Sequence, residues 1–342
     1  MRSLRLISLS AVLNVLITPL FGQDVLFTQT GILPMHLNPA LAGTEVKVRA
    51  AGAYRTQWKA LGVPFSTSAM SVDMNTSSRE TSSRRSRDAS KGLGLGLGFL
   101  NDRGGDPEYI TTQAHIAVAY KLQAGDNSWI SLGMSGSFDQ RSVDVSGGQW
   151  GSQYNGFHYD PSLASGEVFN ADRVGIIHAG AGLAFGWMSD TDSRKGSPRR
   201  GFKAGLSAFQ LGEAEIMSSP VLTYRFPARY MAHLEGYIDI GADGFGIDPV
   251  AYYVVQSPFS ILLAGAWFRY AIIDASGFGS SARPLDAALG FFMRSTNAFA
   301  LGARVSWGDY SIAMSYDMAT GCITDRMPHL GAFEIALMWA MY

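Results

Sequence analysis

The chain has 342 residues, of which 47% are hydrophobic and 16% are charged, and its formal net charge at pH 7 is -1. This near-neutral balance argues against nucleic acid as a partner, because such binding needs a basic face that neutralises phosphates. Soluble domains usually carry about a quarter charged residues, so the composition indicates a protein with little water-facing surface.

The first 22 residues have the pattern of a secretory signal peptide. The start is positively charged, residues 6–20 are mostly apolar, and Gly22 is a small residue before a plausible cleavage point. The apolar run is interrupted and short for a membrane helix. The sequence therefore predicts export, with removal of residues 1–22. The single cysteine, Cys322, excludes a disulfide within the chain.

A turn with the sequence HLNPALAG precedes the first alternating segment. Pro39 keeps Asn38 out of a helix, and the Asn38 side chain can close a turn onto nearby backbone. The small residues that follow let the chain pass close to a wall. We expect residues 23–45 to be a periplasmic segment that leads into the fold and tucks against its mouth. An ordinary turn before the first strand, with no contact to a partner, is the alternative.

From residue 46 onward, apolar side chains alternate with small or polar ones, which is the period typical of strands. In the last segment Phe333, Ile335 and Leu337 fall on one face, and Glu334 falls on the other. About fourteen such segments of roughly ten residues are predicted, at 46–58, 66–74, 91–100, 110–122, 128–139, 174–187, 201–211, 229–240, 248–255, 260–270, 286–294, 298–306, 309–317 and 330–342.

An even number of strands is typical of bacterial outer-membrane barrels, and a sheet can span a bilayer only when it is closed. A soluble β-sandwich would show the same alternation. The signal peptide, the low charge and the aromatic residues at strand ends favour the membrane. We predict an all-β fold, a transmembrane outer-membrane β-barrel of about 14 antiparallel strands over residues 46–342, in contact with outer-membrane lipid. The aromatic residues expected in its girdles are Tyr54, Trp58, Trp129, Trp187, Trp267 and Trp307.

Several features bear on the inside of this barrel. The run GLGLGLG at residues 92–98 has a period of two, so it is a strand rather than a phosphate loop, and its glycines clear room for a plug or a bound peptide. His233, Glu235 and Asp239 share an inward face, which we interpret as polar filling rather than a metal site. Opposed charges on the inward faces predict a crowded, cross-linked lumen. They are Lys47, Arg49, Arg55, Lys121, Arg304, Glu235, Asp239 and Glu334.

Three connections are long or unusual. Residues 75–90 are basic and are interpreted as a solvated loop, with an acidic partner as the alternative. Residues 140–173 are long enough to fold over the barrel, to plug it or to extend outside. Together with residues 213–228, they are the candidate surfaces for a client if both termini lie in the periplasm.

Two motifs near the N-terminus resemble the PorP/SprF family of type IX secretion proteins of Bacteroidota. The family's Asn-Pro-Ala-x-Ala-Gly turn is matched by Asn38, Pro39, Ala40, Ala42 and Gly43, and its Tyr-Arg-x-Gln-Trp strand by Tyr54, Arg55, Gln57 and Trp58. Weaker matches are Asp160-Pro161, residues 314–321 and the final strand with Glu334, where Phe333 replaces the family's histidine.

The resemblance implies a non-enzymatic part of the type IX secretion and gliding machinery in the outer membrane. Its partners would be machinery proteins, or a secreted client held by its C-terminal domain. The residues that it marks as candidates for partner contact are Asn38, Pro39, Ala40, Gly43, Tyr54, Arg55, Gln57, Trp58, Asp160, Pro161 and Glu334. The sequence carries no motif for a catalytic, cofactor or metal site. The alternatives are an outer-membrane channel or transporter for small or hydrophobic solutes and, less favoured, an outer-membrane hydrolase.

Overall fold

The computed structural model describes residues 26–59, 64–76, 92–104, 109–143, 149–166, 173–189, 200–212, 215–219, 222–241, 244–273, 283–296, 298–320 and 331–341. The predicted signal peptide, Cys322 and most of the basic connection 75–90 lie outside these residues.

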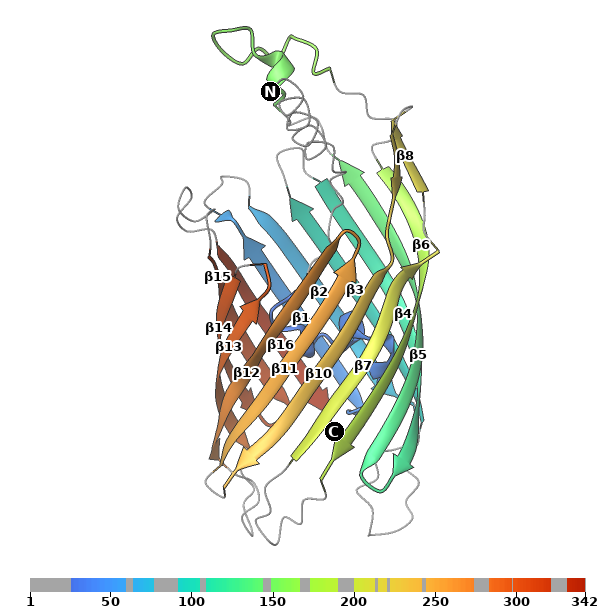
Figure 1. Ribbon diagram of the computed structural model, residues 1–342, viewed down its shortest axis with the longest axis vertical. Helices are drawn as coiled ribbons and strands as arrows, with labels where there is room; N and C mark the ends of the chain where they lie inside the picture. The colour runs from blue at the N-terminus through green and yellow to red at the C-terminus, as the bar shows by residue number, and fades with distance from the viewer. Residues whose placement is uncertain are drawn as a thin grey trace, which may run out of the picture.

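Fourteen strands form one closed antiparallel barrel, in which β1 pairs with β16 and so joins the two ends of the sheet (Figure 1). The strands are β1 (Val48–Gln57), β2 (Phe65–Asn75), β3 (Gly92–Gly104), β4 (Tyr109–Gly125), β5 (Ser128–Val143), β6 (Arg173–Met188), β7 (Arg200–Leu211), β10 (Arg229–Ile240), β11 (Phe245–Gln256), β12 (Phe259–Ile273), β13 (Leu285–Arg294), β14 (Ala298–Trp307), β15 (Tyr310–Ala319) and β16 (Gly331–Met341).

All the predicted strands are present, and the closed antiparallel barrel is confirmed. We call the end where β1 begins and β16 ends the terminal rim, and the opposite end the loop rim. The strands β4 to β6 are longer than predicted, at 16 or 17 residues, whereas about 9–11 tilted residues cross a bilayer. On β5 the outward apolar side chains end at Phe138, and Gln140 and Ser142 follow before the strand ends. The loop-rim end of β5 therefore extends beyond its own outward apolar side chains.

The two faces of the wall differ as a membrane barrel requires. The outer face exposes large apolar side chains along its strands, such as Leu97, Leu132 and Leu289, and a water-soluble protein would not expose an apolar surface of this extent. The inner face buries charged groups, among them Arg49, Asp73 and Glu334. This arrangement supports an outer-membrane location rather than the soluble sandwich.

The prediction for the girdle aromatics is partly wrong. Tyr54, Trp187 and Trp307 are exposed at outward positions of their strands, and Trp58 is exposed just after the end of β1. Trp267 is buried inside, where it stacks against Phe292 with ring centroids 5.1 Å apart, and Trp129 packs against the same internal apolar cluster. Both occupy inward positions of their strands. They were assigned to the girdle because they are aromatic, without regard to the alternation of inward and outward side chains.

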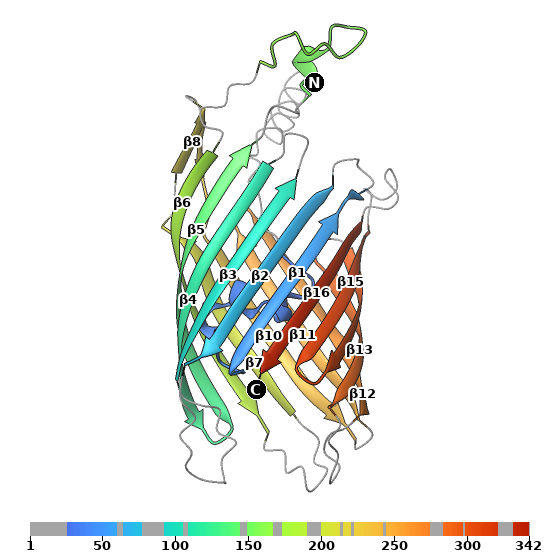
Figure 2. The same ribbon diagram turned by 180° about the vertical axis from the view of Figure 1, so that it is seen from behind.

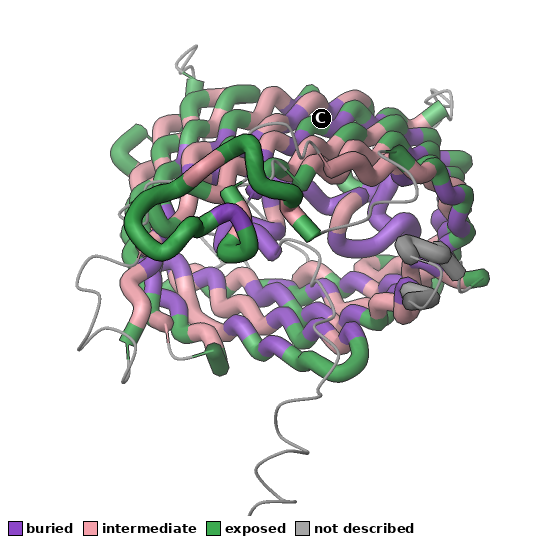
Figure 3. Tube along the Cα trace, turned by 90° about the horizontal axis from the view of Figure 1, so that it is seen from above, coloured by how far each residue is buried: buried purple, intermediate pink, exposed green. Residues whose placement is uncertain are grey.

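Residues 26–46, which we call the plug, lie inside the barrel (Figure 2). The plug contains three short helical turns, η1 (Thr30–Ile32), α2 (Pro34–Leu37) and η2 (Pro39–Leu41). The last two turns begin with a proline, whose fixed φ angle suits a first helical position. From above, the buried chain of the plug is visible within the ring of strands (Figure 3).

Two further features belong to the loop rim. A separate hairpin of β8 (Glu215–Ser219) and β9 (Leu222–Arg225) connects β7 to β10, and a short turn, η4 (Gly151–Gln153), lies in the connection from β5 to β6. In the part of the chain that the structure describes, no helix has the length and apolarity needed to cross a bilayer.

Candidate functional site

The plug runs through the lumen from the loop rim to the terminal rim. At the loop rim, the Leu26 carbonyl accepts a hydrogen bond from Arg294, the last residue of β13. At the other end, the Gly43 N–H donates to a carboxylate oxygen of Asp73 at 2.8 Å. In between, the four large apolar residues Leu33, Met35, Leu37 and Leu41 are at most 1% exposed. Burial of each such side chain stabilises the fold by about 1.5–3 kcal/mol, so the plug is an integral part of the packed structure.

Asn38 attaches the middle of the plug to the wall. Its Nδ2 atom donates to the backbone oxygens of Leu183 on β6 at 3.0 Å and Leu206 on β7 at 3.2 Å. The same atom lies 3.2 Å from Nε2 of His233 on β10. The Oδ1 atom accepts from the Ala40 N–H at 2.9 Å, which is the turn closure that the sequence predicted. The sequence analysis expected this segment at the mouth of the barrel, whereas its described part lies within the lumen.

Glycines on the inward face of the wall provide the space for the plug. A Cβ atom added at Gly94 would lie 2.0 Å from the Ala42 oxygen, and one at Gly96 would lie 2.2 Å from the Met35 sulfur. The prediction that these glycines clear room for a plug is therefore confirmed. The same close approach occurs at three further glycines on β5, β6 and β7, which are Gly133, Gly182 and Gly205.

Near the terminal rim, an ion pair between neighbouring strands fixes the end of the plug. Arg49 and Asp73 face each other in the β1–β2 ladder, and two hydrogen bonds join them, at 2.9 Å from Nε and 2.8 Å from Nη2. A two-point contact between guanidinium and carboxylate is strong and directional. Because Asp73 also accepts from Gly43, this pair positions the chain just before β1. Asn75 adds a hydrogen bond to the Gly43 carbonyl at 3.0 Å.

A second cationic group holds the same end from the opposite wall. Lys203 on β7 lies 3.2 Å from a carboxylate oxygen of Glu45 in the plug and 3.0 Å from one of Glu235 on β10. The Lys203 and Glu235 side chains are almost fully buried. His233 lies on the same strand as Glu235, and both face inward, as predicted. Among the described residues, no group of acidic, histidine or cysteine side chains could hold a metal ion.

The densest polar cluster lies near the loop rim, where the plug begins. Arg55 and Glu334 face each other in the β1–β16 ladder and are joined at 3.1 Å, and Arg55 also contacts Asp317 at 2.8 Å. Glu334 accepts hydrogen bonds from the backbone N–H groups of Thr28 at 2.9 Å and Gln29 at 2.8 Å. The Thr28 hydroxyl donates to Asp317 at 2.7 Å. The three charged side chains are at most 7% exposed.

A family model described as the type IX secretion system membrane protein PorP/SprF matches residues 20–339. The chain belongs to the PorP/SprF family of type IX secretion system membrane proteins. This is a family of the secretion machinery and not of enzymes. No curated protein matches the chain.

Among solved structures, the chain is similar to the toluene transporter TbuX of Ralstonia pickettii, with 13% identity, a TM-score of 0.45, and 91% of this chain and 94% of that chain covered. It is also similar to the monoaromatic hydrocarbon channel TodX, with 10% identity, a TM-score of 0.47 and coverages of 90% and 93%. A FadL homologue of Pseudomonas aeruginosa gives 12% identity, a TM-score of 0.43 and coverages of 89% and 93%. At these values the likeness concerns the barrel fold alone.

Most of the PorP/SprF motif residues of this chain meet at the contact between plug and wall. Asn38, Pro39, Ala40 and Gly43 belong to the plug and are buried. Two others, Arg55 and Glu334, are the paired charges of the loop-rim cluster, and the Gln57 amide oxygen lies 3.4 Å from Arg55 Nε. The motif matches did not indicate which of these residues lie close together. In the structure, two of them that are in contact, Arg55 and Glu334, are 279 positions apart in the chain.

The other motif residues lie elsewhere. Tyr54 faces outward from β1, and Trp58 follows the strand with its ring 5.2 Å from that of Phe65. Asp160 and Pro161 lie in the β5–β6 connection, far along the chain from the plug. Hydrogen bonds from the Ser162 hydroxyl and N–H lower the pKa of the exposed Asp160 carboxyl.

Several residues that hold the plug are not among those predicted from the sequence. These are Asp73, Lys203, Arg294 and Asp317. A signal was available, because all four have the inward parity of their strands, and Asp317 also lies within the matched segment 314–321. The hypothesis of a cross-linked lumen is confirmed by the ion pairs around the plug and by Arg269 with Asp239 at 2.7 Å.

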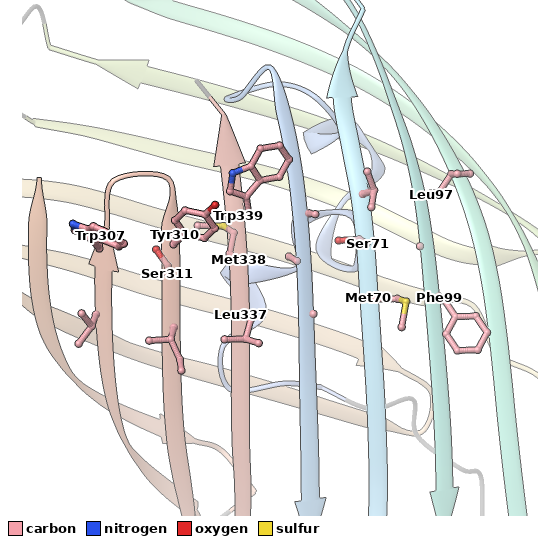
Figure 4. Close-up of a pocket in the computed structure, with 17 residues that line it drawn as sticks. Met70, Ser71, Leu97, Phe99, Trp307, Tyr310, Ser311, Leu337, Met338 and Trp339 are labelled. Carbon is pink, nitrogen blue, oxygen red and sulfur yellow. The ribbon is translucent and has the colours of Figure 1, made fainter. Parts of the chain in front are cut away.

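A hollow of about 840 Å³ lies on the lipid-facing side of the wall, over the seam between β1 and β16 (Figure 4). Small residues of β1, including Ala50 and Gly52, form its floor, and larger side chains such as Met70, Leu337 and Trp339 surround it. Its position on the exterior separates it from the plug. We interpret it as part of the lipid contact surface.

Proposed function

We propose that this PorP/SprF protein supports the secretion or surface attachment of client proteins through their C-terminal domains, and that it acts as a membrane-fixed support rather than a catalyst. Membership of the PorP/SprF family assigns the protein to the type IX secretion system, and its role with clients is our proposal. The observation that carries it is the plug, because a barrel filled by its own chain has its working surfaces at the rims. The described parts of the long connections 140–173 and 213–228 lie at the loop rim and are the surfaces available to a client.

The rival function is a channel for small or hydrophobic solutes on the same barrel. The plug argues against it, because its buried side chains occupy the lumen, and between Leu33, His36 and the wall around Met231 the cavity left measures about 30 Å³. A single water molecule needs roughly 10–15 Å³ of such space. A solute that passed at this place would have to displace buried side chains of the plug.

Two measurements test the proposal. Affinity purification of the tagged protein from intact envelopes should recover a secreted protein through its C-terminal domain, together with machinery proteins. Recovery of neither class, while the barrel itself is folded and abundant, would contradict the proposal. In planar bilayers the purified protein should show little conductance, whereas a large steady conductance would favour the channel.

A further inference from the structure

The connection between β5 and β6 contains an ordered segment, residues 149–166, which we call the tip loop. Its backbone is fixed by its own hydrogen bonds. The Asp160 N–H donates to the Gln153 carbonyl at 2.8 Å, and the Gln153 side chain donates to the Leu163 carbonyl at 3.0 Å. Gln153 is the buried centre of this segment. The Asp160-Pro161 motif therefore lies in the framework of the tip loop.

A tight turn at the end of the tip loop presents one aromatic side chain. Tyr154 and Tyr159 form an antiparallel bridge. Between them, the Asn155 Oδ1 atom accepts from the N–H groups of Phe157 at 3.0 Å and His158 at 3.1 Å. Gly156 has φ of 98°, which suits glycine and closes the turn. The Phe157 side chain is 91% exposed on this fixed turn.

Three observations indicate which kind of surface the Phe157 side chain is suited to bind. The tip loop follows β5, which already extends beyond its last outward apolar residue, Phe138, and it lies past the strand ends (Figure 1), so it is in water and not in the acyl region of the bilayer. Residues 149–166 contain no lysine or arginine, and so they lack the cations that bind anionic lipid head groups. An exposed aromatic on a preorganised turn is the usual form of a protein-binding anchor, because little conformational entropy is lost on binding.

We propose that Phe157 is the anchor by which the tip loop binds a secreted protein domain that offers an apolar pocket, with Tyr154 and Tyr159 beside it. This inference rests on the proposed client role and assigns that role to one surface. The ring enters the pocket of the client, and the tyrosine hydroxyls, exposed at the base of the turn, supply hydrogen bonds at its edge. The outer wall of the barrel takes no part in this contact.

The test begins with a photo-crosslinking phenylalanine analogue at position 157 in cells, with the same analogue at the lipid-facing position 299 as the control. We expect position 157 to form an adduct with the secreted protein that affinity purification recovers, and position 299 to form none with it. An adduct of position 157 with lipopolysaccharide alone, or with a second copy of this chain alone, overturns the inference.

Substitutions then measure the contribution of the ring. Phe157→Ala should lower the amount of co-purified client at least tenfold, the loss expected for an anchor residue, while Phe157→Leu keeps most of it. Phe299→Ala is the matched control and should have no effect, and heat-modifiable gel migration verifies that each barrel is folded. Equal client recovery with wild type and Phe157→Ala overturns this inference but leaves the proposed function intact. Failure of the wild type to recover any client overturns both.

Discussion

Gly182 on the barrel wall and Asn38 in the plug approach so closely that a Cβ atom at Gly182 would lie 1.9 Å from Asn38 Oδ1. The fit leaves no space for any other residue at position 182 unless the plug moves. Because Asn38 also bonds to β6 and β7, such a movement breaks several hydrogen bonds at once. The relationship is therefore a sensitive point at which to test whether the plug is fixed.

Gly133→Ala should loosen the plug, because its Cβ would lie 2.3 Å from the Ala40 nitrogen, a backbone atom. Overpacking of this kind costs about 1–3 kcal/mol. We expect a lower unfolding temperature and faster cleavage of the plug by chymotrypsin. The control is Gly136→Ala on the same strand, where the nearest atom is 4.0 Å away. Equal protease sensitivity of the two variants would contradict a tightly fitted plug.

Asn38→Ala should destabilise the plug without altering the outer wall. The substitution removes hydrogen bonds from a fully buried side chain, and each buried polar group left unpaired costs about 1–3 kcal/mol. Bilayer recordings should show more frequent openings than in the wild type. Asn101→Ala, which loses a single hydrogen bond to Thr112 on the wall, is the control and should leave the conductance unchanged. If Asn38→Ala opened no more often than the wild type, the apolar contacts alone would be sufficient to hold the plug in place.

Arg55→Ala should be among the most destabilising single changes. It leaves Glu334 and Asp317 buried without the guanidinium that joins them, and breaking a buried ion pair costs about 3–5 kcal/mol. Urea unfolding in detergent measures the loss. Arg103→Ala, at an exposed position of β3, is the matched control and should change stability little. A loss below about 1 kcal/mol, typical of surface pairs, would mean that the cluster does not hold the barrel.

Gly52→Ala should stabilise the protein, in contrast to the three substitutions above. Gly52 lies on the lipid-facing side of β1, and its added Cβ would meet only the Ala69 oxygen, at 3.6 Å. Replacing glycine where the backbone and the space allow it stabilises a protein by about 0.4–1 kcal/mol. The unfolding temperature should rise slightly while the protease resistance of the plug stays the same. A loss of stability would contradict the open space that the structure shows above Gly52.

The barrel could be predicted from the sequence because its pattern is local. Each strand carries the alternation in its own residues, so Phe299 and Leu301 could be assigned outward and Arg304 inward without knowledge of their neighbours. The location of the plug depends on contacts between residues far apart in the chain, and no single segment contains that information. The turn at Asn38 was predicted correctly, but its wall partners on β6, β7 and β10 could not be. Trp267 was assigned to the aromatic girdle because it is a tryptophan, although the alternation along its strand places it on the inward face.

The direction of the plug constrains how the protein is assembled in the membrane. The plug descends from the loop rim, and β1 then rises from the terminal rim beside it, so the two stretches form a hairpin with its bend near Val46. The plug therefore continues directly into the first strand of the sheet that surrounds it. Since β1 and β16 form the closing seam, closure of the sheet encloses a segment of the same polypeptide.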